Sequence, residues 1–61
     1  MEKIKRKLRA YARSVGYRVS FSDGEREGTI AGCDGNGLPL IQYEIGSDTF
    51  YDYGKGKNLP L

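Results

Sequence analysis

Positive charge is concentrated at the N-terminal end of the chain. Residues 1–16 have a net charge of +5, whereas residues 17–61 have a net charge of −3. Six cations on one short segment suit contact with DNA or RNA, because each neutralised phosphate adds a salt-dependent increment to the affinity. The alternative is a solvated surface, or one docked near acidic strands of the same domain. The six cations are Lys3, Lys5, Arg6, Lys7, Arg9 and Arg13.

A second group of residues with nucleic-acid chemistry lies near the C-terminal end. Residues 49–53 alternate as a strand does, so Tyr51 and Tyr53 share one face and Phe50 lies on the other. If Phe50 points inward, the two tyrosines point outward beside Lys55 and Lys57, where aromatic rings can stack on bases. If the tyrosines point inward, they belong to the core. The sequence favours this second arrangement, although the first stays open.

No other residues form a pattern typical of catalysis or metal binding. The single cysteine, Cys33, has no histidine to act as its base, because the chain contains none. Residues 34–37 resemble the start of a calcium loop, but Leu38 and Leu40 break the alternation of oxygen ligands. The Gly-Lys-Gly-Lys segment at 54–57 lacks the glycine spacing of a phosphate loop. We therefore expect no enzymatic activity, no metal and no cofactor.

The length and composition narrow the class of protein. Sixty-one residues make one domain of marginal stability. A lone cysteine cannot form a disulfide within the chain, and without histidine a zinc site is not expected, which leaves a homodimer as a further source of stability. The sequence has no long apolar run, so we expect no segment that spans a membrane. It also has no signal-peptide pattern, so we expect a cytoplasmic location.

The N-terminal cations are expected on an amphipathic helix over residues 2–15. At about 100° per residue, four apolar side chains fall within a narrow arc, and the cations occupy the rest of the circumference. Gly16 follows the last apolar position, as a left-handed C-cap would. The predicted apolar stripe consists of Ile4, Leu8, Tyr11 and Val15, with Ala12 at its edge.

Short alternating segments separated by turn residues predict antiparallel strands after the helix. Asn36-Gly37 is typical of a tight hairpin turn with positive φ angles, and the preceding Asp34-Gly35 indicates a longer loop that can include a bulge. The predicted strands are at about 17–22, 26–32, 38–45 and 49–53, with a further short edge strand at 58–61. The residues predicted to face inward are Tyr17, Val19, Phe21, Ile30, Ile41, Tyr43 and Ile45.

The predicted fold class is α+β, with an N-terminal helix followed by a small antiparallel SH3-like barrel of four or five strands, or by a curved sheet. Gly28 and Gly32 flank Ile30 on one face, and glycines at strand positions favour the sharp bends of a barrel. The barrel is therefore the preferred alternative.

The hairpin segment Gly28-x-Ile30-x-Gly32-Cys33-Asp34-x-x-Gly37-Leu38-x-Leu40 resembles a pattern in the SH3-like C-terminal domain of biotin protein ligases. The resemblance covers about thirteen positions of the 61 and departs at Cys33, where that family has an aliphatic residue. It implies a barrel fold only. Because the sequence does not contain the ligase catalytic domain, no biotin or ATP chemistry carries over.

These observations favour a small, non-enzymatic nucleic-acid-binding protein. Phosphate contacts would come from the basic helix, with Tyr51, Tyr53, Lys55 and Lys57 as a second patch and with weak sequence preference. The alternative is a protein–protein interaction module, such as an accessory or inhibitor protein of a mobile element. Such a module would bind an acidic protein surface, or a second copy of the chain, through complementary charge.

Overall fold

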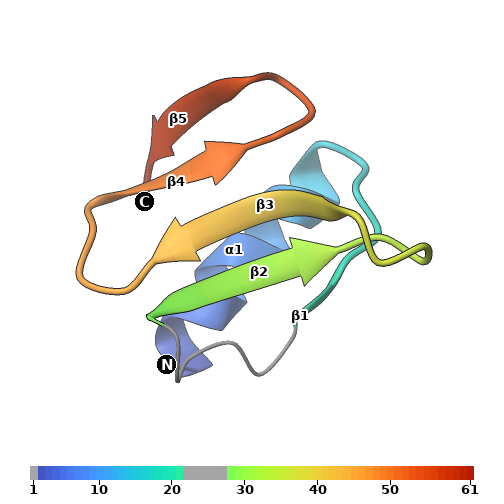
Figure 1. The fold of residues 1–61 in the computed structure, drawn as a ribbon. Helices are drawn as coiled ribbons and strands as arrows, with labels where there is room; N and C mark the ends of the chain where they lie inside the picture. The colour runs from blue at the N-terminus through green and yellow to red at the C-terminus, as the bar shows by residue number, and fades with distance from the viewer. Residues whose placement is uncertain (1, 22–27) are drawn as a thin grey trace.

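One helix packs across one face of an antiparallel sheet (Figure 1). The computed structural model describes residues 2–21 and 28–61. The elements in this part of the chain are α1 (Glu2–Ser14), β1 (Ser20–Phe21), β2 (Thr29–Cys33), β3 (Pro39–Glu44), β4 (Thr49–Asp52) and β5 (Lys57–Pro60). Each strand pairs with the next one in the sequence, in the order β1-β2-β3-β4-β5. The predicted α+β class is therefore confirmed.

The sheet is open. Its edges are β1 and β5, and no pairing joins these two strands within the described residues. Of the two arrangements that the sequence allowed, the sheet is observed and the barrel is not. Gly32, which favoured the barrel, has another role: a Cβ there would lie 3.0 Å from Cε1 of Phe21 and 3.3 Å from Cβ of Val19. Gly32 thus makes room for side chains on the inner face rather than for a closing bend.

The C-terminal end of α1 is capped by Gly16. This residue has a φ of +82°. The N–H of Tyr17 donates to the carbonyl of Ala12 at 2.8 Å, and the N–H of Gly16 donates to the carbonyl of Arg13 at 3.2 Å. This pair of hydrogen bonds is the Schellman motif, in which glycine adopts the left-handed conformation without steric cost. The predicted C-cap is confirmed, and it places Tyr17 directly after the helix.

The core lies between α1 and the inner face of the sheet. Ala12 is only 1% exposed and lies at the centre of the contact, whereas Val15 is half-buried and lies outside the core cluster. The predicted stripe, with Val15 as a member and Ala12 at its edge, was therefore wrong in these two positions. The small side chain of Ala12 lets the helix approach the sheet closely. The buried core residues are Leu8, Ala12, Ile30, Ile41, Tyr43 and Phe50, with Ile4, Tyr11, Tyr17, Val19, Phe21 and Ile45 packed against them.

The first two strands differ most from their predicted ranges. β1 has only two residues of the expected 17–22, because Tyr17 is already hydrogen-bonded in the helix cap. β2 runs to Cys33 rather than to residue 32. Positions 22, 26 and 27 of the two predicted strands lie outside the described residues. The other three strands agree with their predicted ranges to within one residue at each end.

Asp34 organises the turn between β2 and β3. Its Oδ1 accepts the N–H of Asn36 at 2.8 Å and the N–H of Leu38 at 3.0 Å. Gly37 has a φ of +82°, but no other type of residue in the described part of the chain has a positive φ. The predicted positive φ is therefore confirmed at Gly37 and wrong at Asn36, because the Asp34 side chain forms an Asx turn instead. The register shift at the end of β2 is the predicted bulge.

Candidate nucleic-acid interface

The exposed face of α1 carries most of the predicted phosphate contacts. Leu8 and Ala12 hold the opposite face of the helix against the sheet. Five cations are exposed as a result, namely Lys3, Arg6, Lys7, Arg9 and Arg13, and Lys5 is half-buried. Within residues 2–21 and 28–61, no carboxylate forms an ion pair with any of the five exposed cations. The guanidinium of Arg9 lies 5.5 Å from the centroid of the Phe21 ring, at a cation–π distance.

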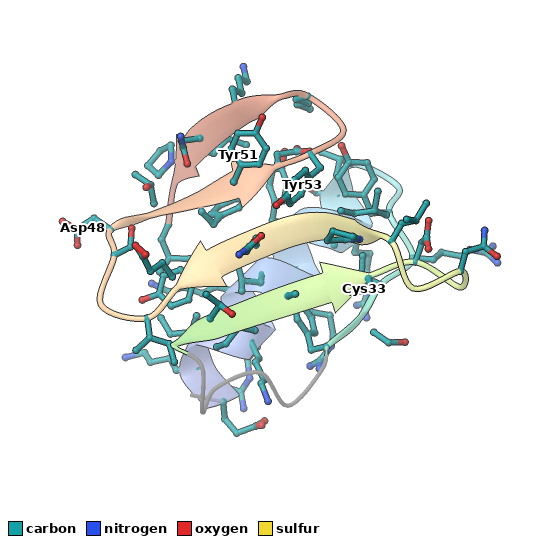
Figure 2. All side chains as sticks on the ribbon, viewed as in Figure 1. Cys33, Asp48, Tyr51 and Tyr53 are labelled. Atoms are coloured by element: carbon teal, nitrogen blue, oxygen red, sulfur yellow. The ribbon has the colours of Figure 1, made fainter. Side chains whose placement is uncertain are left out.

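Tyr51 and Tyr53 point away from the core. Phe50 and Asp52 are buried on the inner face, so alternation places the two tyrosines on the outer face, which α1 does not cover (Figure 2). The core assignment that the sequence favoured is therefore wrong. A strand with Phe50 and an aspartate on one face and two tyrosines on the other is ambiguous, because burying a carboxylate is costly unless it is hydrogen-bonded. The partners of Asp52 come from distant parts of the chain.

The predicted nucleic-acid contacts do not form one surface. The helix cations lie on the side of the molecule that α1 covers, whereas Tyr51 and Tyr53 lie on the other side of the sheet (Figures 1 and 2). Lys55 is in the turn after β4, and its side chain is exposed. Lys57 begins β5 opposite Asp52, so its exposed side chain leaves the edge strand on the inner side. We call the first surface the helix face and the second, with its tyrosines and Lys55 beside them, the sheet face.

A buried carboxylate links α1 to the sheet. Asp52 is fully buried and accepts hydrogen bonds from the hydroxyls of Tyr11 and Tyr17. The Tyr17 bond measures 2.8 Å, and the backbone N–H of Lys55 donates to the same Oδ1 atom at 3.1 Å. Tyr11 comes from α1 and Tyr17 from the Schellman cap, so one carboxylate fixes the helix against β4. Charge-assisted hydrogen bonds of this kind are among the strongest in proteins.

The ionisation of this cluster is set by its hydrogen bonds. Burial alone raises the pKa of Asp52, but the hydrogen bonds from Tyr11, Tyr17 and the backbone N–H groups of Lys55 and Gly54 outweigh it and hold the pKa below its ordinary value. The hydrogen bond to Asp52, together with desolvation and the nearby negative charge, raises the pKa of Tyr11 to about 12. The same causes raise the pKa of Tyr17. The cluster therefore holds one carboxylate and two neutral phenols at neutral pH.

Sequence reasoning missed this cluster. Tyr11 was assigned to the apolar stripe, and its hydroxyl group was not used in the prediction. A tyrosine in a core-facing stripe is a signal in itself, because a buried phenol needs a hydrogen-bond partner. Asp52 lies on the same strand face as Phe50, so it is the carboxylate that could accept the hydrogen bond of such a phenol. The arrangement can hold the helix in place, and the carboxylate at its centre is fully buried.

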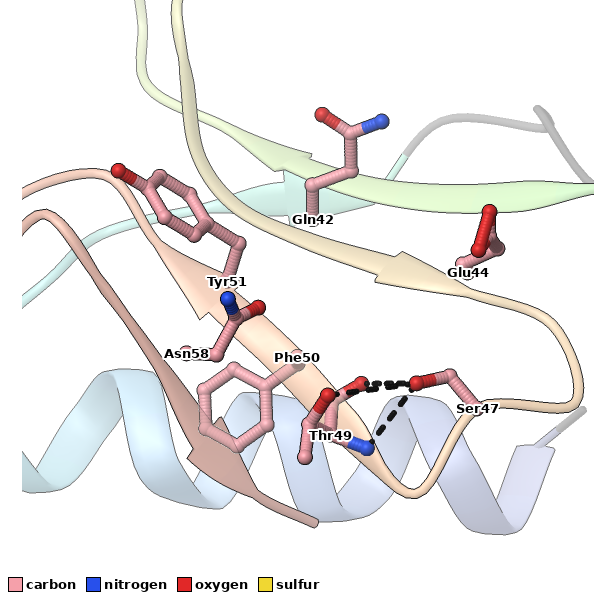
Figure 3. A pocket seen from close by; sticks show the side chains of 7 residues that line it. All are labelled: Gln42, Glu44, Ser47, Thr49, Phe50, Tyr51 and Asn58. Carbon is pink, nitrogen blue, oxygen red and sulfur yellow. Dashed lines mark hydrogen bonds between the residues drawn. The ribbon is translucent and has the colours of Figure 1, made fainter.

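The sheet face contains a shallow hollow of about 250 Å³ (Figure 3). Gln42 and Asn58 are the cross-strand neighbours of Tyr51, on β3 and β5 respectively. At the end of the hollow nearest the β3–β4 turn, the Ser47 hydroxyl contacts the backbone and hydroxyl of Thr49. The lining residues are Gln42, Glu44, Ser47, Thr49, Phe50, Tyr51 and Asn58.

A larger, mostly apolar groove of about 490 Å³ lies between α1 and β5. Lys7 is the charged side chain in its lining. The other lining residues are Ala10, Tyr11, Phe50, Leu59, Pro60 and Leu61. This groove is separate from the sheet face, because β5 and the core side of Phe50 form its wall.

The remaining candidates for chemistry do not come together. Cys33 is a half-buried free thiol at the end of β2. Among the residues that the structure describes, no group of three histidine, cysteine or acidic side chains is placed to hold a metal ion. Over the same residues, α1 is the only helix, and it is neither long nor apolar enough to cross a bilayer.

Comparison with family models, curated proteins and solved structures found no match to this chain. The resemblance of the 28–40 hairpin to the biotin protein ligase domain therefore stays a prediction. Function has to be inferred from the two surfaces themselves.

Proposed function

We propose that this protein binds nucleic acid without catalysis, through phosphate contacts made by the helix face. The observation that carries the proposal is the row of five exposed cations on α1, for which no ion pair exists within residues 2–21 and 28–61. Positive charge that is not neutralised internally is available to an anionic polymer.

The dimensions of α1 support this proposal. Lys3 and Arg13 are ten residues apart, which is about 15 Å along a helix that rises about 1.5 Å per residue. One strand of a duplex presents a phosphate about every 3.4 Å along its axis, so the helix spans about four of them. The core contacts of Leu8 and Ala12, together with the Asp52 cluster, hold the helix in one orientation. A rigid row of cations loses little conformational entropy on binding.

The test is to titrate the protein into a labelled DNA duplex and into an RNA duplex of the same sequence. Fluorescence anisotropy of the label measures the binding. With about four phosphate contacts, the affinity should fall roughly 100-fold between about 50 and 200 mM salt. Little difference between unrelated sequences is expected, because phosphate contacts carry no base information. Failure to bind either duplex at the lower salt concentration would remove the proposal.

A matched pair of variants distinguishes binding by the helix face from attraction to the net charge of the protein. The double variant Arg6→Glu and Arg13→Glu should weaken duplex binding by at least about 10-fold at low salt. The control Lys55→Glu and Lys57→Glu changes the net charge by the same amount at the β4–β5 turn and should leave duplex binding nearly unchanged. Equal losses in both variants would show attraction to overall charge rather than to α1.

The second candidate function is binding of an acidic protein segment, and the groove between α1 and β5 favours it. The groove is mostly apolar, with Lys7 as its charged side chain, so an acidic partner with apolar anchors complements it. Pairing at the β5 edge is disfavoured, because Pro60 has no N–H. Capture of one stoichiometric partner, unaffected by nuclease and lost in Leu59→Asp, would support this candidate over nucleic acid.

A further inference from the structure

The sheet face is a strand surface with aromatic rings and amide groups that α1 leaves uncovered. Tyr51 lies between Gln42 and Asn58 in the cross-strand register, and Tyr53 follows on the same side (Figures 2 and 3). Tyr53 is 45% exposed, one of two large hydrophobic side chains in the described residues with a largely exposed surface. An exposed aromatic ring can stack on a base, and the amide groups beside it can hydrogen-bond the edge of that base.

The two rings are held in fixed orientations. Their centroids are 4.8 Å apart and their planes are inclined at 80°, which is an edge-to-face contact. The Tyr53 hydroxyl donates to Oε1 of Gln42 at 2.6 Å. This bond occupies the Gln42 oxygen and leaves its NH₂ group, with two donors, directed at no protein acceptor in the described residues. Rings that are ordered in advance lose little entropy when a ligand stacks on them.

Charge is unevenly distributed along this face. Lys55 lies at the end where β4 turns into β5, two residues after Tyr53, and Lys57 adds positive charge at the same end from the inner side of β5. The hydroxyl of Tyr51 also reaches this end, 3.9 Å from the position of a Cβ on Gly56. Glu44 and Asp48 lie at the opposite end, beside the β3–β4 turn. An anion is therefore attracted to the Tyr53 end and repelled from the other.

We propose that the sheet face binds the unpaired bases of a short single-stranded segment of DNA or RNA. A base stacks on the ring of Tyr53 or Tyr51, the free amide groups of Gln42 and Asn58 meet its edge, and the adjacent phosphate lies at Lys55. This combination of aromatic faces, amides and a flanking lysine complements a nucleotide better than a second copy of the chain, whose own Lys55 would repel it. The inference goes beyond the proposed function, because it uses another face and needs unpaired bases.

The probe is a fluorescein-labelled tetranucleotide, oligo-dU or oligo-rU, which is too short to contact both faces. Tyr53→Leu should weaken its binding roughly 5- to 150-fold, the range expected for loss of one stacked base. Tyr53→Phe keeps the ring and loses only the bond to Gln42, so it should retain most of the affinity. Because Tyr53 is exposed, both variants should keep the wild-type circular dichroism spectrum.

An abasic tetramer with the same number of phosphates is the control for charge. It should bind much more weakly than either oligonucleotide, and equal binding would overturn the proposal. Comparison of the two sugars distinguishes DNA from RNA as the source of the bases. Unchanged binding in Tyr53→Leu would also overturn the proposal. So would concentration-dependent dimerisation that Tyr53→Leu abolishes, because a second copy would then cover the face.

The helix variant Arg6→Glu and Arg13→Glu separates this proposal from the previous one. It should lose duplex binding and keep the affinity for the tetranucleotide. If it loses the tetranucleotide as Tyr53→Leu does, the short strand binds α1 and the inference is wrong. If duplex binding is absent from the wild-type protein while the tetranucleotide still binds, the helix proposal fails and this one stands.

Discussion

The Tyr17 hydroxyl donates a 2.8 Å hydrogen bond to Oδ1 of Asp52, which is 35 positions later in the chain. The phenol comes from the residue after the helix cap, and the carboxylate comes from the last residue of β4. Tyr11 donates to the other carboxylate oxygen from within α1. A polar cluster at the helix–sheet contact thus supplements the small apolar core of a 61-residue chain.

Replacing Asp52 with alanine should destabilise the protein by about 1–3 kcal/mol. The substitution removes a buried acceptor and leaves two phenols and two backbone N–H groups without their partner. Asp48→Ala is the matched control, because Asp48 is exposed in the turn before β4, and it should change stability by less than about 0.5 kcal/mol. The measurement is urea unfolding followed by circular dichroism. Similar midpoints for the two variants would contradict a stabilising role for the cluster.

Stability should decrease in acid because of Asp52. Its pKa is lowered in the folded protein, so its contribution is complete above the unfolded value of about 3.9 and is lost as the pH falls through the lower folded value. The urea concentration at the unfolding midpoint should therefore decrease when the pH is lowered below about 4. Asp52→Asn should flatten this part of the profile, and an unchanged slope in that variant would assign the acid loss to other carboxylates.

Alkaline pH should also weaken the cluster, through ionisation of its two phenols. The pKa of Tyr11 is raised to about 12 and that of Tyr17 is also raised, so their contribution is complete below the unfolded value of about 10. It is lost as the pH rises through the folded values. In a phenolate absorbance titration, two tyrosines should ionise above the ordinary value of about 10. Tyr11→Phe should remove one of these late components, and a wild-type titration without any late component would contradict the cluster.

Gly54→Ala should destabilise the fold although its φ is not positive. A methyl group at Gly54 would overlap the hydroxyl of Tyr17 and lie 3.3 Å from Oδ1 of Asp52, so the phenol would have to move away from the carboxylate. Crowding of this kind costs about 1–3 kcal/mol. Gly35→Ala is the control, since its Cβ would meet no atom within 4 Å. If the two variants melt at the same temperature, the close approach of Tyr17 to the β4–β5 turn is not required.

Leu8→Ala should cost about 2–5 kcal/mol, because Leu8 is fully buried where α1 meets the sheet. In a domain this small, that loss is comparable to the whole free energy of unfolding, so the variant should be largely unfolded at 25 °C. Leu38→Ala, at a position that is 61% exposed, removes the same atoms from the surface and should have little effect. The helical circular dichroism signal at low temperature reports the difference, and a folded Leu8→Ala protein would contradict the assigned core.

Several features followed from local sequence patterns. The helix, its Gly16 cap and the three C-terminal strands all lie within about one residue of their predicted ranges, because periodicity and turn residues act over a few positions. The clustering of cations on α1 is likewise a property of the sequence, since helical geometry alone separates them from Leu8. The turn at Asn36-Gly37 is present, but the positive φ expected at Asn36 was wrong, because the Asp34 side chain binds the backbone N–H groups.

What only the tertiary structure decided is which face of β4 is buried, and with it the existence of the sheet face. When the strand is considered alone, its two faces are nearly equal candidates for the core. One face carries Phe50 and Asp52, and the other carries Tyr51 and Tyr53. The choice depends on phenols that arrive from 41 and 35 positions away and satisfy the carboxylate. Because the cost of burying Asp52 is offset only by those distant partners, no local pattern could have placed the tyrosines outside.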